Sequence, residues 1–184
     1  MKNKYDTQWN FIGYLRERAR LSSPEMQHEL GISYPEAKEL LELSEHMKWI
    51  TYTGRGFDYV VHTERVPSKR LSDKELAQAY ACVDHSHSSL IKLFLTDPGF
   101  SRKRLSELLL EDYKVTAFLE LCSVLELARE IQGRFYLAWD IESILMLVAL
   151  AQDKFKRMWD DEDEIANAEW QVLRYRRMMK YGHP

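Results

Sequence analysis

Three consecutive cations follow Ser101, a residue type that often caps the first turn of a helix. The free amide groups of such a turn attract phosphate, and three basic side chains would add to that attraction. Two further polar residues open the next predicted helix, and one arginine lies in a predicted hairpin. We therefore expect the phosphates of double-stranded DNA to be contacted by Arg102, Lys103, Arg104, Lys114, Thr116 and Arg134. The alternative is that the three cations only keep an exposed turn soluble.

A second group of candidate contacts lies earlier in the chain. Ser33 and Tyr34 stand at the start of a predicted helix, and Arg55 lies between two glycines at the tip of a predicted hairpin. The same helix carries a glutamate at every third position from Glu36 to Glu45, and these carboxylates would repel phosphates. Two interpretations stay open: DNA contacts at Ser33, Tyr34 and Arg55, or a solvated acidic helix face beside a tight turn.

A basic segment near the C-terminus supplies secondary candidates for contact with phosphate or with an acidic partner. Its cations are Arg174, Arg176, Arg177 and Lys180. They come after the acidic run of residues 160–164. Because the helix dipole favours acids at the start of a helix and bases at its end, this arrangement is also explained without any ligand.

No pattern typical of an enzyme is present. The sequence has no phosphate-binding loop, dinucleotide-binding fingerprint or zinc-protease motif. Cys82, His85 and His87 are loosely spaced like metal ligands, but His85 and His87 cannot share one helix face, so a helix break explains them better. Asp97 with residues 112–114 mimics the order of a metal-dependent nuclease, which would need adjacent strands. We expect no catalytic residue, metal, cofactor or small-molecule substrate.

Composition limits the class of protein. The chain has 184 residues, 45% hydrophobic and 30% charged, and can therefore bury a core. Lys and Arg number 26 against 29 Asp and Glu, a formal net charge of −3 that excludes a strongly basic coat protein for nucleic acid. The mean hydropathy of −0.46 leaves no room for a membrane span. We expect a cytoplasmic protein, with Cys82 and Cys122 as buried thiols.

The first part of the chain, residues 1–66, is here named unit 1. Helical spacing over residues 7–21, a short helix from Ser22 or Ser23 to Leu30, and a capping box at Ser33 and Glu36 predict three helices. The period then changes to two, and residues 49–61 predict a β-hairpin around Gly54-Arg55-Gly56.

Residues 67–71 lack patterning and are predicted to be a linker, and residues 72–140 are named unit 2. A capping box at Ser72 and Glu75, helices ending near Leu95, Leu109 and Arg129, and a hairpin over residues 131–139 repeat unit 1 in outline. Sliding the two units over each other pairs Met26 with Leu105 and Leu30 with Leu109 at offset 79, then Leu40 with Leu121 and Ile50 with Ile131 at offset 81.

Three helices with a tight turn between the second and third, followed by a hairpin, are typical of a winged helix-turn-helix. The sequence therefore predicts a mainly α fold with small β-hairpins: two winged helix-turn-helix units plus C-terminal helices. The segment from Ser23 to Ile50 resembles the winged-helix gamma domain of bacterial DNA translocases, in its core positions Met26, Leu30, Ile32, Ala37, Leu40, Met47 and Ile50. The resemblance implies a winged-helix fold for this segment. The family has basic residues in the helix where this chain has the glutamates from Glu36 to Glu45.

The last segment, residues 141–184, is predicted to be helical and to serve packing or dimerisation. Residues 141–159 carry too broad an apolar face for one solvated side, which predicts a second copy or another protein as partner. Our leading hypothesis is a non-enzymatic DNA-binding homodimer acting in regulation, replication or partition. The alternative is a protein-binding adaptor subunit of a larger DNA-associated complex, with little DNA affinity of its own. Tandem winged-helix subunits of bacterial chromosome-condensing complexes are similar in this overall plan.

Overall fold

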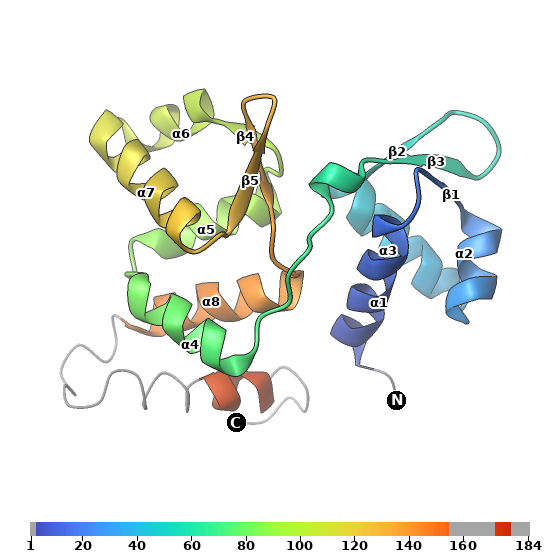
Figure 1. The fold of residues 1–184 in the computed structure, drawn as a ribbon, viewed down its shortest axis with the longest axis horizontal. Coiled ribbons are helices and arrows are strands. Elements are labelled where there is room, and N and C mark those ends of the chain that lie inside the picture. The colour runs from blue at the N-terminus through green and yellow to red at the C-terminus, as the bar shows by residue number, and fades with distance from the viewer. Residues whose placement is uncertain (1–2, 155–171, 178–184) are drawn as a thin grey trace.

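The computed structural model describes residues 3–154 and 172–177. Over these residues the chain is mainly helical with two small antiparallel sheets of three strands each, which confirms the prediction of a mainly α fold with small β-hairpins. Unit 1 lies to the right and unit 2 to the left in Figure 1, and the segment that joins them runs between the two. Within the described ranges, none of the helices has the length and apolar character needed to span a membrane.

Unit 1 consists of four helical elements and one sheet. In chain order these are α1 (Lys4–Arg16), β1 (Arg20–Ser22), α2 (Ser23–Leu30), α3 (Tyr34–His46), β2 (Ile50–Tyr52), β3 (Asp58–Val61) and the 3₁₀ turn η1 (Thr63–Arg65). The strands lie in the order β1-β3-β2, so the strand that precedes the helix pair joins the later hairpin. The buried residues of these elements belong to one hydrophobic core cluster that continues into unit 2.

Local sequence signals place α2 and α3. Gly31 ends α2 in the left-handed conformation, and Ser33 begins α3. The Glu36 carboxylate accepts from the Ser33 amide at 2.8 Å, and the Glu36 amide donates to Ser33 Oγ at 3.5 Å, which confirms the predicted capping box. Ser22 caps α2 without a side-chain hydrogen bond. The buried residues of α3 then face the core while its glutamates remain exposed.

The prediction of one helix over residues 7–21 is wrong at its end. The helix α1 stops at Arg16, Ala19 is exposed, and Leu21 is buried in β1 opposite Tyr59 of β3. A strand of three residues leaves no alternating pattern for sequence reasoning to find, and its pairing partner lies beyond two helices. The pairing matters because it fixes the start of α2 against the hairpin.

Unit 2 has the same order of elements after one additional helix. Its elements are α4 (Asp73–Cys82), α5 (His87–Thr96), β4 (Phe100–Ser101), α6 (Arg102–Leu109), α7 (Asp112–Val124), β5 (Ala128–Ile131) and β6 (Arg134–Leu137). The sheet order β4-β6-β5 matches that of unit 1. Ser72 and Glu75 form the predicted capping box of α4. Of the two thiols, Cys122 is buried as expected, whereas Cys82 is exposed.

The structure corrects the register of the repeat. The helices α2 and α6 both have eight residues and begin at Ser23 and Arg102, an offset of 79; α3 and α7 both have thirteen and begin at Tyr34 and Asp112, an offset of 78. Leu40 therefore corresponds to Phe118, and the predicted pairing with Leu121 is wrong. The connection between the two helices is one residue shorter in unit 2, where the prediction had two residues inserted.

The ends of α3 and α7 repeat in backbone detail. Lys48 and Glu126 both adopt a left-handed conformation, with φ of 59° and 51°. The amide that follows each of them donates 2.9 Å back to a helical carbonyl, Trp49 to Ser44 and Leu127 to Cys122. Neither position is a glycine, so the same non-glycine helix end occurs twice in one chain. This agreement is independent of the side-chain pattern and supports the one-to-one register.

The helix α8 (Ile141–Lys154) is covered by its own chain. Ile144, Leu147 and Ala151 are buried, and α8 packs against α5 and α4, while Val172 of the C-terminal helical residues 172–177 is also buried in the core. The broad apolar face over the described part of residues 141–159 therefore has a partner within the monomer. The acidic run of residues 160–164 lies outside the described residues, and the predicted dimer stays a prediction.

Two arginines hold the units together. Arg70, in the segment predicted as a linker, lies 2.9 Å from Asp6 of α1 and 2.5 Å from the buried Glu142 of α8. Arg129 of β5 donates to the Glu64 and Val66 carbonyls and to Ser68 Oγ, at 3.3, 3.0 and 2.7 Å. Arg70 thus connects α1 to α8, and Arg129 connects η1 and the linker to β5 of unit 2.

Candidate nucleic-acid interface

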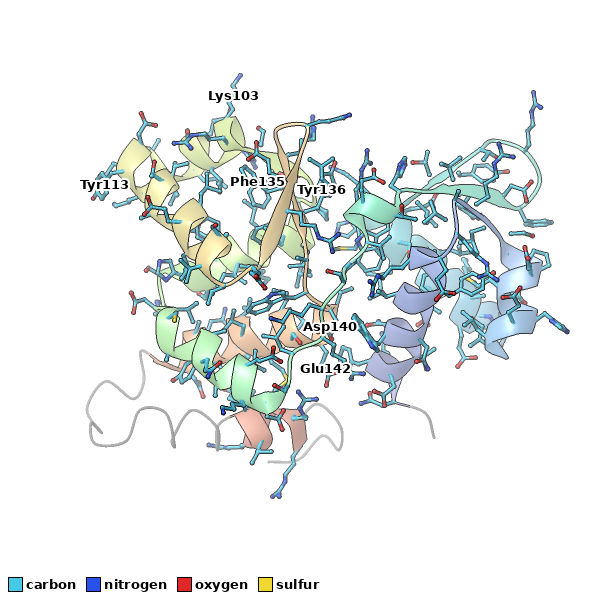
Figure 2. All side chains as sticks on the ribbon, viewed as in Figure 1. Lys103, Tyr113, Phe135, Tyr136, Asp140 and Glu142 are labelled. Carbon is cyan, nitrogen blue, oxygen red and sulfur yellow. The ribbon has the colours of Figure 1, made fainter. Side chains whose placement is uncertain are left out.

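The first three residues of α6 are the predicted cations Arg102, Lys103 and Arg104, and all three are exposed. Ser101 caps the helix, with its hydroxyl accepting from the Arg104 amide at 3.3 Å, as the sequence predicts. The remaining amides of this turn have no helical partner and carry partial positive charge. Figure 2 shows Lys103 projecting outward from α6.

Arg134 joins these cations through the sheet. In the antiparallel pairing of β4 with β6, Ser101 lies opposite Arg134, so the arginine emerges beside the start of α6. Its Nη1 donates to the Gly99 carbonyl at 2.9 Å, which orients the guanidinium over the β4 turn. Four of the six predicted contacts thus lie at one place, here named the basic end of unit 2: Arg102, Lys103, Arg104 and Arg134.

Gly99 allows the close approach that this pairing requires. Its φ of +75° belongs to the left-handed region, and a Cβ at this position would lie 2.8 Å from the ring of Tyr136. The ring of Tyr136 is buried and cannot move aside cheaply. Glycine at residue 99 is therefore needed for β4 to pack against β6 and for Arg134 to reach the start of α6.

The cations of the basic end differ in how strongly they are engaged. Arg104 lies 3.5 Å from Asp97 and 3.5 Å from Glu107, two exposed ion pairs of the kind that contribute about 0 to 1 kcal/mol. Arg102 Nη2 donates to the Thr116 hydroxyl of α7 at 3.1 Å. Lys103 has no hydrogen bond or ion pair within the described part of the chain. A phosphate would find Lys103 free and could displace the weak partners of Arg104.

Thr116 and Lys114, both on α7, take different roles. Thr116 connects α7 to Arg102 and so belongs to the basic end. Lys114 is instead paired with Glu111 at 2.8 Å, and this neighbour raises the pKa of Lys114 through a hydrogen bond and its charge. Tyr113 lies next to this pair at the exposed start of α7, as Figure 2 shows.

The candidates of unit 1 lie away from the basic end. The Ser33 hydroxyl is occupied by the Glu36 capping box, Tyr34 is exposed at the start of α3, and Arg55 is exposed at the hairpin tip. Figure 1 shows this hairpin on the side of unit 1 that points away from unit 2. The structure therefore does not bring Ser33, Tyr34 and Arg55 together with the cations of α6.

The C-terminal candidates are partly engaged inside the protein. Arg176 lies 2.8 Å from Asp73 of α4 and 3.8 Å from Glu142 of α8. Arg174 is half-buried and Arg177 is exposed, while Lys180 falls outside the described residues. The ion pairs of Arg176 hold residues 172–177 against α4 and α8. The sequence analysis explained these cations by the helix dipole and did not predict this structural role.

Position by position, unit 1 reverses the charge of the basic end. The register of the repeat aligns Arg102, Lys103 and Arg104 with Ser23, Pro24 and Glu25, and the sheet pairing aligns Arg134 with Asp58, which lies opposite Ser22. Four positive charges in unit 2 therefore correspond to two negative charges in unit 1. The basic end belongs to unit 2 alone.

Sequence reasoning missed a hollow beside α3 in unit 1 and another beside α7 in unit 2. In unit 2 a cavity of about 530 Å³ lies between α7 and the hairpin, with Arg102, Glu120 and Phe135 among its lining residues. In unit 1 a smaller one of about 290 Å³ occupies the equivalent position. Phe135 and Tyr59 stand at corresponding hairpin positions, and both are half-buried residues that line the hollows. An aromatic residue at the same position of both hairpins was the sequence signal that could have indicated the two hollows.

Comparison with known proteins gave no match among protein families, curated sequences or solved structures.

Proposed function

We propose that this chain is a non-enzymatic, cytoplasmic DNA-binding protein built from two winged helix-turn-helix units, with unit 2 making the phosphate contacts. The order of elements supports this proposal: a helix, a short strand, two helices and a hairpin, as expected for a winged helix, with α4 preceding this order in unit 2. In such folds the third helix enters the major groove while the start of the second helix and the hairpin contact the backbone.

The observation that carries the proposal is the pairing of Ser101 with Arg134. It adds a hairpin cation to the three at the start of α6, so one surface presents four positive charges and several free amides. Positive charge at this density attracts phosphate even on a protein whose net charge is −3, because the interaction is local at physiological salt.

A charge reversal tests the proposal. The variant Arg102→Glu, Lys103→Glu, Arg104→Glu should lose binding to a fluorescein-labelled random duplex, measured by anisotropy at low and at physiological salt. The control is Lys38→Glu, Lys74→Glu, Lys92→Glu, three exposed lysines on α3, α4 and α5, which carries the same total change in charge. Equal losses in both variants, or binding retained by the first, would overturn the assignment.

The alternative function, an adaptor that binds protein and has little DNA affinity, is favoured by one observation. The third helix of unit 1 exposes all four glutamates from Glu36 to Glu45. That face opposes DNA and suits a protein partner. No measurable affinity of the wild-type protein for the duplex at low salt, in a folded sample, would favour the adaptor.

A further inference from the structure

The hollow of unit 1 lies between α3 and the β2–β3 hairpin, and it is rimmed by exposed aromatic rings. Tyr34 is 64% exposed at one side and Phe57 is 66% exposed at the other, with half-buried Tyr59 and buried Leu41 also among the lining residues. Tyr52 stands next to Tyr59, with 5.4 Å between the ring centroids, and is itself 45% exposed. Clustered exposed aromatic side chains mark interaction sites far more often than isolated ones do.

The same hollow is electrostatically negative. Glu42 and Glu45 of α3 line it, and the one lining cation among the described residues, Lys38, is already paired with Glu42 at 3.7 Å. Burial raises the pKa of the Tyr59 hydroxyl, and the Glu45 carboxylate raises it further. Phosphate is disfavoured at such a place, whereas a positively charged group is attracted to the carboxylates and to the faces of the rings.

These features belong to unit 1 and are not general to the repeat. In the equivalent hollow of unit 2, Arg102 stands where unit 1 has Ser23, and Ser123 stands where unit 1 has Glu45. The position of Tyr34 is taken by Asp112. The fold therefore provides two equivalent hollows, of which unit 1 alone combines exposed aromatic rings with carboxylates and no unpaired lining cation among its described residues.

We propose that the hollow of unit 1 docks a basic segment of another protein. An Arg or Lys side chain of that segment packs on Tyr34 or Phe57 and pairs with Glu42 and Glu45, while an apolar side chain rests on Leu41 and Tyr59. Charge complementarity selects this partner over nucleic acid and over acidic peptides. The inference concerns unit 1 and does not depend on DNA binding by unit 2.

Selection from a phage-displayed library of random dodecapeptides on the full-length protein tests the proposal. Enriched peptides should carry at least two Arg or Lys residues around an apolar residue. A synthetic copy of the most enriched peptide, titrated by fluorescence anisotropy, should bind Glu42→Lys, Glu45→Lys at least tenfold more weakly than it binds wild type. The matched control is Glu120→Lys, Ser123→Lys, which places lysines at the equivalent positions of α7 and should leave the affinity unchanged.

A second variant separates the hollow from a general charge effect. Phe57→Ser removes an exposed ring without changing charge and should weaken the peptide at least threefold, with an unchanged circular dichroism spectrum. Enrichment of acidic or uncharged peptides, no enrichment above background, or equal loss in the control would overturn the proposal. So would competition by a DNA duplex that persists in the Arg102→Glu, Lys103→Glu, Arg104→Glu variant, because it would place nucleic acid in the hollow.

Discussion

Arg134 and Asp58 occupy the same position in two equivalent sheets: Arg134 pairs with Ser101 across β4 and β6, and Asp58 pairs with Ser22 across β1 and β3. The backbone around both pairs follows the same path, from the short strand into the second helix. The side chains therefore differ in charge on a common framework. At this position the basic end of unit 2 has a cation, whereas the equivalent surface of unit 1 has a carboxylate that would repel phosphate.

The salt dependence of DNA binding should report on Lys103. Each phosphate contact contributes about 0.9 to the slope of log K against log salt concentration. Because Lys103 has no partner in the described chain, Lys103→Ala should lower that slope by about one and weaken different random duplexes equally. Anisotropy titrations at several salt concentrations measure the slope. Lys92→Ala on α5 is the control, and an unchanged slope in Lys103→Ala would contradict the phosphate contact.

Breaking the ion pair between Arg70 and Glu142 should destabilise the fold. Glu142 is buried and lies 2.5 Å from Arg70 and 3.8 Å from Arg176, and Figure 2 shows it at the start of α8. Glu142→Gln removes a buried carboxylate that both guanidinium groups contact, although Arg70 keeps Asp6 and Arg176 keeps Asp73. The loss of these charged hydrogen bonds should lower the free energy of unfolding by about 1.5 to 3 kcal/mol. Urea denaturation followed by circular dichroism measures the change. Glu39→Gln on the exposed face of α3 should change it by less than about 0.5 kcal/mol.

The contribution of Asp140 to stability should depend on pH. Burial raises the pKa of Asp140; hydrogen bonding to Ser143 and the nearby charge of Arg70 lower it by less, and Glu142 raises it again. A raised pKa means that the folded state binds the proton more tightly than the unfolded state, so this stability is present at low pH and lost as pH rises through the raised value. Asparagine does not titrate, so Asp140→Asn should not lose stability in this way as the pH rises.

Urea denaturation between about pH 4, near the ordinary pKa of an aspartate, and pH 7 checks this expectation. The unfolding free energy of Asp140→Asn relative to wild type should increase over that range. A difference that stays flat, or that decreases with rising pH, would contradict the assignment of a raised pKa to Asp140.

Leu110 should be replaceable by glycine with a gain in stability. It ends α6 with a φ of 59°, is 86% exposed, and corresponds to Gly31 at the end of α2. A left-handed conformation costs a non-glycine residue about 1 kcal/mol, so Leu110→Gly should raise the free energy of unfolding by about 0.5 to 1 kcal/mol. Leu108→Gly, within the same helix, should lower it by about 1 kcal/mol. The same sign in both variants would contradict the explanation.

Local signals in the sequence were sufficient for the capped helix starts and for the hairpin of unit 1. In unit 2 the predicted end of the third repeat helix near Arg129 is wrong, because α7 ends at Val124 and the hairpin predicted over residues 131–139 already begins at Ala128. The capping boxes at Ser33 and Ser72 depend on residues three apart, and both form as predicted. The short strands β1 and β4 were not predicted because their residues pair with partners on the far side of two helices. The register of the repeat was wrong because leucine was matched with leucine, whereas the core position of Leu40 is filled in unit 2 by Phe118.

The candidate site was partly predictable for the same reason. The run from Arg102 to Arg104 and its cap at Ser101 are contiguous in the sequence, and the structure places them together. Whether Arg134 would join them depended on the β4–β6 register, and the engagement of Arg176 by Asp73 and Glu142 depended on how the C-terminal residues pack. The position of Arg134 and the ion pairs of Arg176 both depend on contacts between residues far apart in the sequence. The pattern within one segment does not predict such contacts.

The contacts of Arg70 and Arg129 set the spacing between the two units, because they tie α1 to α8 and η1 and the linker to β5 of unit 2. The orientation of one unit relative to the other is already fixed in the free protein. The entropy of fixing it is therefore lost during folding and is not lost again when both units bind a ligand. A protein segment held at the hollow of unit 1 and a duplex held at the basic end of unit 2 would sit at one defined separation. The molecule would therefore fix the distance between its two ligands.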